Sequence, residues 1–145
     1  MSQSGLTPGR ALERARAELG IEASVNGEAE LVDRIDEDGV AYFLIVFGEP
    51  TSSIAVAAID RAGGGLLSSA RLPGAGPHRS VNAAEAIERA GLEGSSTARL
   101  VWKPSRQSRS PLYPLWEVRA AEGTVYVDEQ GRVWPELEPG GPGGA

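Results

Sequence analysis

The segment 112–134 constrains the fold more than any other part of the chain, because apolar and polar residues alternate along it on both sides of a turn. Val125 and Val127 follow a turn at residues 121–123, and a second turn at 128–131 leads into a short final run. Period-two alternation of β-branched and aromatic residues is typical of half-buried antiparallel strands. The segment therefore predicts a β-meander that ends in an edge strand.

Length and composition allow a folded chain and exclude several kinds of site. The chain has 145 residues, 41% of them hydrophobic, which is enough for one domain or for two small repeats. It has no cysteine and a single histidine, His78, so thiol chemistry is excluded and zinc or histidine catalysis is disfavoured. A net charge of −6 argues against a nucleic-acid partner. We expect no metal and no cofactor.

The sequence has no feature of a membrane or secreted protein. Its longest apolar run, residues 40–47, is too short to span a bilayer. The first residues lack the basic and apolar regions of a signal peptide. We therefore expect a cytoplasmic protein without a membrane partner.

Two helices and a series of strands are predicted along the chain. Thr7 and Asn82 stand where N-caps are needed, and Gly20 and Gly91 where helices end. Apolar residues recur at helical spacing between these caps, and at strand spacing elsewhere. The expected elements are helices at 7–19 and 82–91 and strands at 29–35, 40–48, 54–60, 66–72 and 97–103, followed by the meander.

The two halves of the chain have the same expected order of elements. Gly20 and Gly91 are separated by 71 residues, as are Tyr42 and Tyr113. We therefore predict an α+β fold made of two repeats, each with one helix packed on an antiparallel β-meander, related by a pseudo-two-fold axis.

These repeats give an expected domain plan. Residues 7–72 form the first repeat, 73–81 a linker rich in proline and glycine, and 82–135 the second repeat. Residues 1–6 and the Gly/Pro-rich residues 136–145 are predicted to be disordered.

The second half carries a pattern that resembles a known family. It reads Trp-Glu-Val at 116–118, Val-Tyr-Val-Asp at 125–128 and Gly-Arg-Val at 131–133, with Gln130 where the family usually has threonine. This resembles the hairpin of PepSY domains over about residues 82–134. The resemblance implies a role in peptidase regulation. The tandem arrangement is also similar in outline to beta-lactamase-inhibitor proteins.

Aromatic and basic residues of the second half are the candidates for a binding surface. They are Trp102, Lys103, Arg106, Arg109, Tyr113, Trp116, Glu117 and Tyr126. Large aromatic residues on a sheet often anchor interfaces, although core packing is the expected use for at least two of the three tryptophans. Glu117 either faces solvent or lines a concave sheet with Tyr113 and Tyr126.

Two charged loops complete the candidates. The basic stretch 103–109 either docks an acidic partner or is a mobile charged loop. The acidic stretch 36–38, with Asp33 before it, lacks EF-hand spacing and is interpreted as a solvated hairpin tip. Their opposite charges predict weak, salt-sensitive self-association or capture of a charged partner, with solubility alone as the alternative.

The function predicted from the sequence is a non-catalytic protein-binding or regulatory module of a peptidase-inhibitor-like kind. Residues that catalysis needs are scarce, whereas residues that interfaces use are plentiful. One alternative is a small-molecule-binding or enzymatic domain with a cleft that uses Arg99, Tyr113 and Glu117 as polar groups. The other is a homodimerising structural protein.

Overall fold

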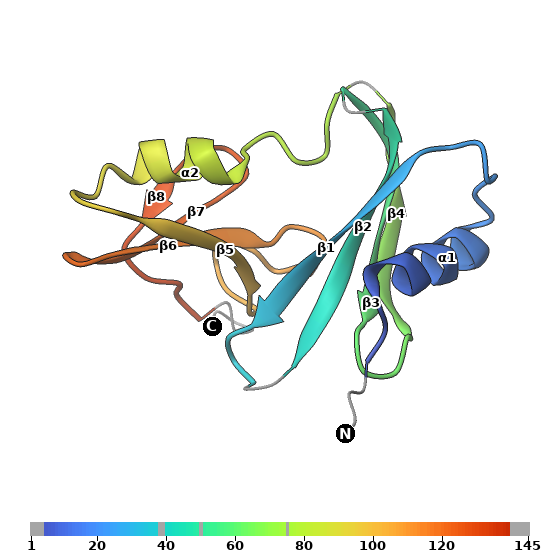
Figure 1. Ribbon diagram of the computed structural model, residues 1–145, viewed down its shortest axis with the longest axis horizontal. Helices are drawn as coiled ribbons and strands as arrows, with labels where there is room; N and C mark the ends of the chain where they lie inside the picture. The colour runs from blue at the N-terminus through green and yellow to red at the C-terminus, as the bar shows by residue number, and fades with distance from the viewer. Residues whose placement is uncertain (1–4, 38–39, 50, 75, 140–145) are drawn as a thin grey trace. The chain divides into compact units, whose positions relative to one another are not determined.

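The computed structural model describes residues 5–37, 40–49, 51–74 and 76–139 (Figure 1). The chain divides into two compact units, residues 1–78 and 79–145. Each unit contains one helix followed by four strands. The elements are α1 (Pro8–Leu19), β1 (Gly27–Arg34), β2 (Ala41–Glu49), β3 (Ser52–Asp60), β4 (Leu66–Arg71), α2 (Ala83–Ala90), β5 (Thr97–Trp102), β6 (Leu115–Ala120), β7 (Gly123–Val127) and β8 (Val133–Trp134).

Both helices begin and end at the residues that the sequence indicates. The Thr7 side chain accepts a hydrogen bond from the Arg10 N–H at 3.2 Å, and the Asn82 side chain accepts one from the Glu85 N–H at 2.8 Å. Gly20 and Gly91 end the helices in the left-handed conformation. The predicted caps are therefore confirmed.

The first unit packs α1 on one face of an antiparallel sheet. Within this unit β4, β3, β2 and β1 are neighbours in that order. Ala11 and Ala15 of α1 have no exposed surface, so the helix backbone approaches the sheet closely. The core under α1 is formed by Ala11, Ala15, Ile21, Phe43, Ile45, Phe47, Ala55, Ala57 and Ile59.

The second unit packs the shorter α2 on β5, β6 and β7. Its strands pair antiparallel in the order β5, β6, β7 and β8. Trp116 donates its indole N–H to the Val81 carbonyl oxygen at 2.8 Å, just before the helix begins. The Arg79 guanidinium lies 5.3 Å from the centre of the same ring system. This tryptophan therefore holds the entry to α2 against the sheet.

The α+β class is compatible with the structure, but the predicted division of the fold into two repeats is wrong. The strands of the described residues are assigned to one eight-stranded sheet, and not to two repeats each made of a helix and its own β-meander. Sequence periodicity shows where strands lie and which of their faces are apolar. It carries no signal for which strand edges join, because backbone N–H and C=O groups are the same in every residue except proline.

Both predicted disordered ends include residues that are part of the folded structure. Leu6 donates its N–H to the Arg61 carbonyl oxygen at 2.8 Å, and Leu137 is buried. The Glu138 carbonyl oxygen accepts a hydrogen bond from the Arg106 N–H at 2.9 Å. The composition of these ends does not predict that Leu6 and Leu137 belong to the fold, because each is a single apolar residue in a polar or Gly/Pro-rich stretch. The rest of these predicted ends, residues 1–4 and 140–145, lies outside the described residues.

Candidate functional site

A cluster of charged and polar side chains crosses the middle of the second unit's sheet. Arg99 of β5 lies opposite Glu117 of β6, which in turn lies opposite Tyr126 of β7. Residues directly opposite on neighbouring strands have side chains on the same face of the sheet. Arg119 is two positions further along β6 and shares that face. We call these four residues the Glu117 cluster.

Glu117 is the buried centre of this cluster. Its side chain is only 3% exposed. Its Oε1 atom accepts a hydrogen bond from Arg99 Nε at 2.8 Å and forms an ion pair with Arg119 Nε at 3.0 Å. Its Oε2 atom lies 3.4 Å from the Tyr126 hydroxyl. The expectation that Glu117 faces solvent is therefore wrong. The carboxylate is stable there because two guanidinium groups balance its charge.

Tyr126 is half-buried beside the Glu117 carboxylate, and both features act on its phenol. Burial of the phenol raises its pKa above the ordinary value of 10.0, and the neighbouring Glu117 carboxylate raises it further. The two arginines lower the pKa by a smaller amount. The neutral phenol is thus the favoured form, and it can donate to the carboxylate.

The raised pKa of Tyr126 predicts a pH effect on stability. Its contribution is fully present below the unfolded pKa of about 10 and is lost as pH rises from there through the folded pKa. Ultraviolet titration of the wild type and of Tyr126→Phe should assign to Tyr126 an absorbance step above about pH 10, because that step is missing from the variant. In Glu117→Gln that tyrosine should ionise at lower pH, because the carboxylate charge is gone. An unchanged titration curve in this variant would show that the Glu117 carboxylate does not raise the pKa of Tyr126, and would leave burial as the cause.

The segment that connects β5 to β6 has a defined internal structure. Within it Ser105 and Ser108 are buried, and the Ser105 N–H donates to the Ser108 carbonyl oxygen at 3.0 Å. Ser108 Oγ accepts the Trp102 indole N–H at 3.1 Å and lies 2.6 Å from the Tyr113 carbonyl oxygen, to which it donates. Residues 103–113, which we call the basic loop, are therefore held by a hydrogen-bond network. They are not the mobile loop considered from the sequence.

This network leaves the charged side chains of the basic loop at the surface. Arg106 and Arg109 are exposed, Lys103 is half-buried, and Tyr113 is 46% exposed. Arg106 lies 3.5 Å from a Glu138 carboxylate oxygen, and both side chains are at least half exposed, so this ion pair is weak. The loop thus displays positive charge beside an accessible aromatic ring.

The remaining predicted binding residues, Trp102, Trp116 and Tyr126, are buried or half-buried. Trp102 and Trp116 are 5% and 7% exposed, and each has its indole N–H bonded to the protein, so we assign both to the core. Tyr126 is half-buried beside Glu117. Sequence reasoning missed Ser105, Ser108 and Arg119. Serines in a basic stretch indicate a solvated loop as well as a buried network, and Arg119 is one of many charged residues at strand positions.

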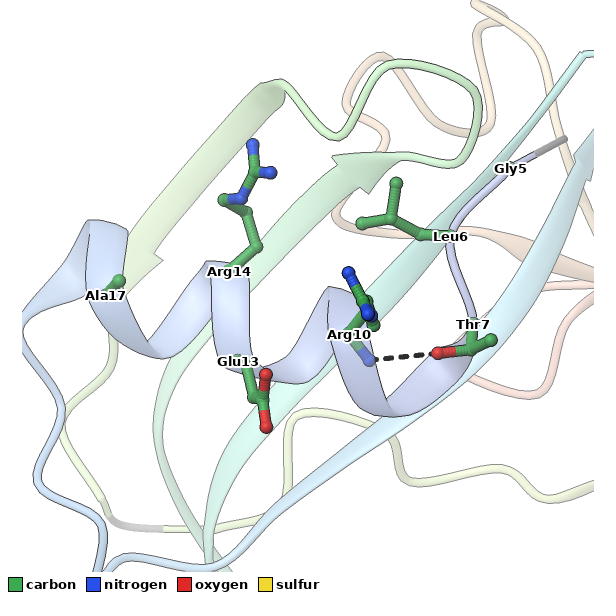
Figure 2. Close-up of a pocket in the computed structure, with 7 residues that line it drawn as sticks. All are labelled: Gly5, Leu6, Thr7, Arg10, Glu13, Arg14 and Ala17. Atoms are coloured by element: carbon green, nitrogen blue, oxygen red, sulfur yellow. Dashed lines mark hydrogen bonds between the residues drawn. The ribbon is translucent and has the colours of Figure 1, made fainter.

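An open pocket of about 440 Å³ lies beside the start of α1 in the first unit (Figure 2). Figure 2 shows the Arg10 and Arg14 side chains on the same side of α1 as Leu6. Arg14 donates a side-chain hydrogen bond to the Gly64 carbonyl oxygen at 3.0 Å, and the backbone N–H of Arg10 already donates to the Thr7 side chain. The pocket residues are mostly exposed and belong to a capped helix start, so this pocket is a weaker candidate than the second unit's surface.

The acidic loop and His78, which were also considered from the sequence, form contacts within the protein. Asp36 forms a bidentate ion pair with Arg34, in which Nη2 lies 2.7 Å from Oδ2 and Nε lies 3.1 Å from Oδ1. Asp38 lies outside the described residues. The His78 N–H donates to Ser53 Oγ at 2.8 Å.

Among the described residues no three His, Asp or Glu side chains are grouped to hold a metal ion. Neither helix in the described part of the chain is long and apolar enough to cross a membrane.

Comparison with known proteins adds no relative, since no protein family, no curated protein and no solved structure matches this chain.

Proposed function

We propose that the protein is a non-catalytic binding module that uses its basic loop to dock an acidic segment of a protein partner. The observation that carries the proposal is the buried serine network, which fixes a loop that displays Arg106 and Arg109. A loop that is ordered before binding loses less conformational entropy when a partner docks. Charged residues on such a surface steer a partner of opposite charge.

Tyr113 gives this surface a second type of contact. Its side chain is 46% exposed, although its carbonyl oxygen is held by Ser108. A tyrosine offers a large apolar surface with few rotatable bonds, and such residues are common centres of binding energy. The partner segment should therefore combine acidic residues with one apolar side chain. A peptidase is one class of partner, which the resemblance to PepSY domains implies.

The Glu117 cluster favours this proposal over an enzymatic cleft. Both carboxylate oxygens of Glu117 are within hydrogen-bonding distance of partners from the protein itself. A general base needs an oxygen that can reach a substrate proton. We therefore interpret Glu117 as a positioning residue for Arg99 and Arg119.

Reversing the charge of the basic loop is expected to weaken acidic-peptide binding. The probe is a fluorescent synthetic peptide of alternating Glu and Leu, and fluorescence polarisation measures its Kd at about 20 mM and about 500 mM salt. Arg106→Glu/Arg109→Glu should raise the Kd about tenfold or more at low salt, because two attractive contacts become repulsive. High salt should reduce the difference.

The matched control changes the same net charge elsewhere. Arg10→Glu/Arg132→Glu replaces two exposed arginines outside the basic loop. The two double variants are compared at about 150 mM salt, where the Debye length is about 8 Å. There the control should leave the peptide's Kd within about twofold, because charges that the docked peptide does not contact are largely screened. Equal weakening by both double variants would show that total charge alone attracts the peptide. That result would contradict a docking role for the basic loop.

A further inference from the structure

The outer strand of the first unit's sheet, β4, has one edge without a strand partner in the described part of the chain. β4 is the end member of the strand order and pairs with β3 (Figure 1). Two of its large apolar residues are accessible, with Leu66 39% and Leu67 48% exposed. An exposed edge of this kind is a template for pairing with another strand.

The hydrogen-bond register shows which backbone groups of β4 face outward. The Leu72 N–H donates to the Ile54 carbonyl oxygen at 2.9 Å, so this pair is a hydrogen-bonded one. Hydrogen-bonded pairs recur at every second residue of an antiparallel ladder. Ser68 and Ala70 therefore bond to β3, whereas the N–H and C=O groups of Ser69 and Arg71 point away from the sheet.

β4 lacks most of the features that protect natural sheet edges. Its sequence, Leu-Leu-Ser-Ser-Ala-Arg, contains no proline, no lysine and one charged residue at its end. Arg71 also donates a side-chain hydrogen bond to the Leu19 carbonyl oxygen of the same unit. A register shift near Ile59 disturbs only the opposite end of β4. By contrast, β8 at the other end of the strand order has only two residues.

We propose that β4 pairs antiparallel with β4 of a second copy of this chain. A strand that pairs antiparallel with its own copy obeys two-fold symmetry, so one surface serves both partners. The two-fold axis can pass through Ser69 or Ala70, since both registers bring outward-facing backbone groups together. The axis at Ser69 places Arg71 opposite Leu67 of the second copy, and the axis at Ala70 places it opposite Ser69.

Side-chain charge does not oppose this pairing, because Arg71 is the single charged residue of β4. Neither register puts Arg71 opposite a second Arg71, so no like charges face each other directly. Small side chains at Ser69 and Ala70 leave the centre of the pairing open to close approach. A peptide partner would use the same edge, but nothing on β4 selects one, whereas a second copy supplies a strand of matching length. One short strand pair is a small interface, so the dimer is weak.

The proposed dimer is tested by mass and by a single charge change. Sedimentation equilibrium from about 10 µM to about 1 mM should show the mean mass of the wild type rising toward twice the monomer value. Ser69→Lys should keep the monomer mass throughout, because in either register the introduced ammonium group faces a positive charge of the other copy. Ser95→Lys is the matched control, because it makes the same substitution at an exposed serine of the second unit that lies outside the strands.

Hydrogen exchange identifies the surface that forms the dimer. In the monomer the Ser69 and Arg71 amides should exchange fast while Ser68 and Ala70 are protected. At high concentration the Ser69 and Arg71 amides should become protected at least severalfold in the wild type and in Ser95→Lys only. A wild type that stays monomeric at all concentrations would overturn the proposal. So would a dimer that survives Ser69→Lys with both amides still exchanging fast.

Discussion

Replacing Glu117 with alanine is expected to lower the free energy of unfolding by about 2 kcal/mol. The carboxylate is 3% exposed and forms ion pairs with two guanidinium groups, at 2.8 and 3.0 Å. Its removal leaves Arg99 and Arg119 close together without the negative charge that offsets their repulsion. Both arginines are about half exposed and can turn toward water, which limits the loss to less than that of a fully buried pair.

Urea denaturation followed by circular dichroism measures this loss. Glu88→Ala on α2 is the matched control, because it removes an exposed carboxylate and should change the free energy of unfolding by less than about 0.5 kcal/mol. Glu117→Gln should lie between the two, since the amide keeps the shape and one acceptor oxygen but loses the charge. If Glu117→Ala were as stable as Glu88→Ala, the cluster would not hold the sheet together.

The parts of the fold that sequence could predict are those coded locally. Helix α1 was predictable because Thr7 and Gly20 mark its two ends and apolar residues follow one face between them. The meander was predictable because its alternation is regular and its turns contain glycine. In both cases the signal lies within a few residues of the structure that it specifies.

The surroundings of Glu117 depend on residues far apart in the sequence. Alternation along β6 puts Glu117 on the opposite face from Trp116, but this pattern alone gives no difference between a solvated and a buried carboxylate. The charge is balanced by Arg99, whose position depends on the register between β5 and β6. A long loop separates those strands, and loops of that length do not fix a register.

The basic loop shows the same limit in a different way. Its composition is that of a solvated segment, and only the positions of Ser105 and Ser108 distinguish it. A buried serine needs partners for its hydroxyl, and here the partners are backbone groups of the loop and the Trp102 indole. Such a network becomes recognisable only when the chain is folded, because serine is equally common in turns and caps.

Gly48→Ala is expected to cost about 3 kcal/mol of the free energy of unfolding, the largest effect of any change considered for the first unit. Gly48 has a φ of 126°, where residues with a side chain are rarely found. A Cβ atom at this position would overlap the Ser52 carbonyl oxygen, and it would lie 3.0 Å from the Ile54 backbone nitrogen. These neighbours are backbone atoms of the adjoining strand, so they cannot rotate away.

The strain cannot relax locally because Gly48 is fixed from both sides. The register between β2 and β3 shifts between Phe47 and Gly48, and the Gly48 N–H donates to the Asn26 carbonyl oxygen at 2.9 Å. Gly65→Ala is the matched control, since no atom lies within 4 Å of its Cβ position and its φ is not positive. That variant should be neutral or slightly more stable. Equal midpoints of urea denaturation for the two variants would show that the turn after β2 can rearrange.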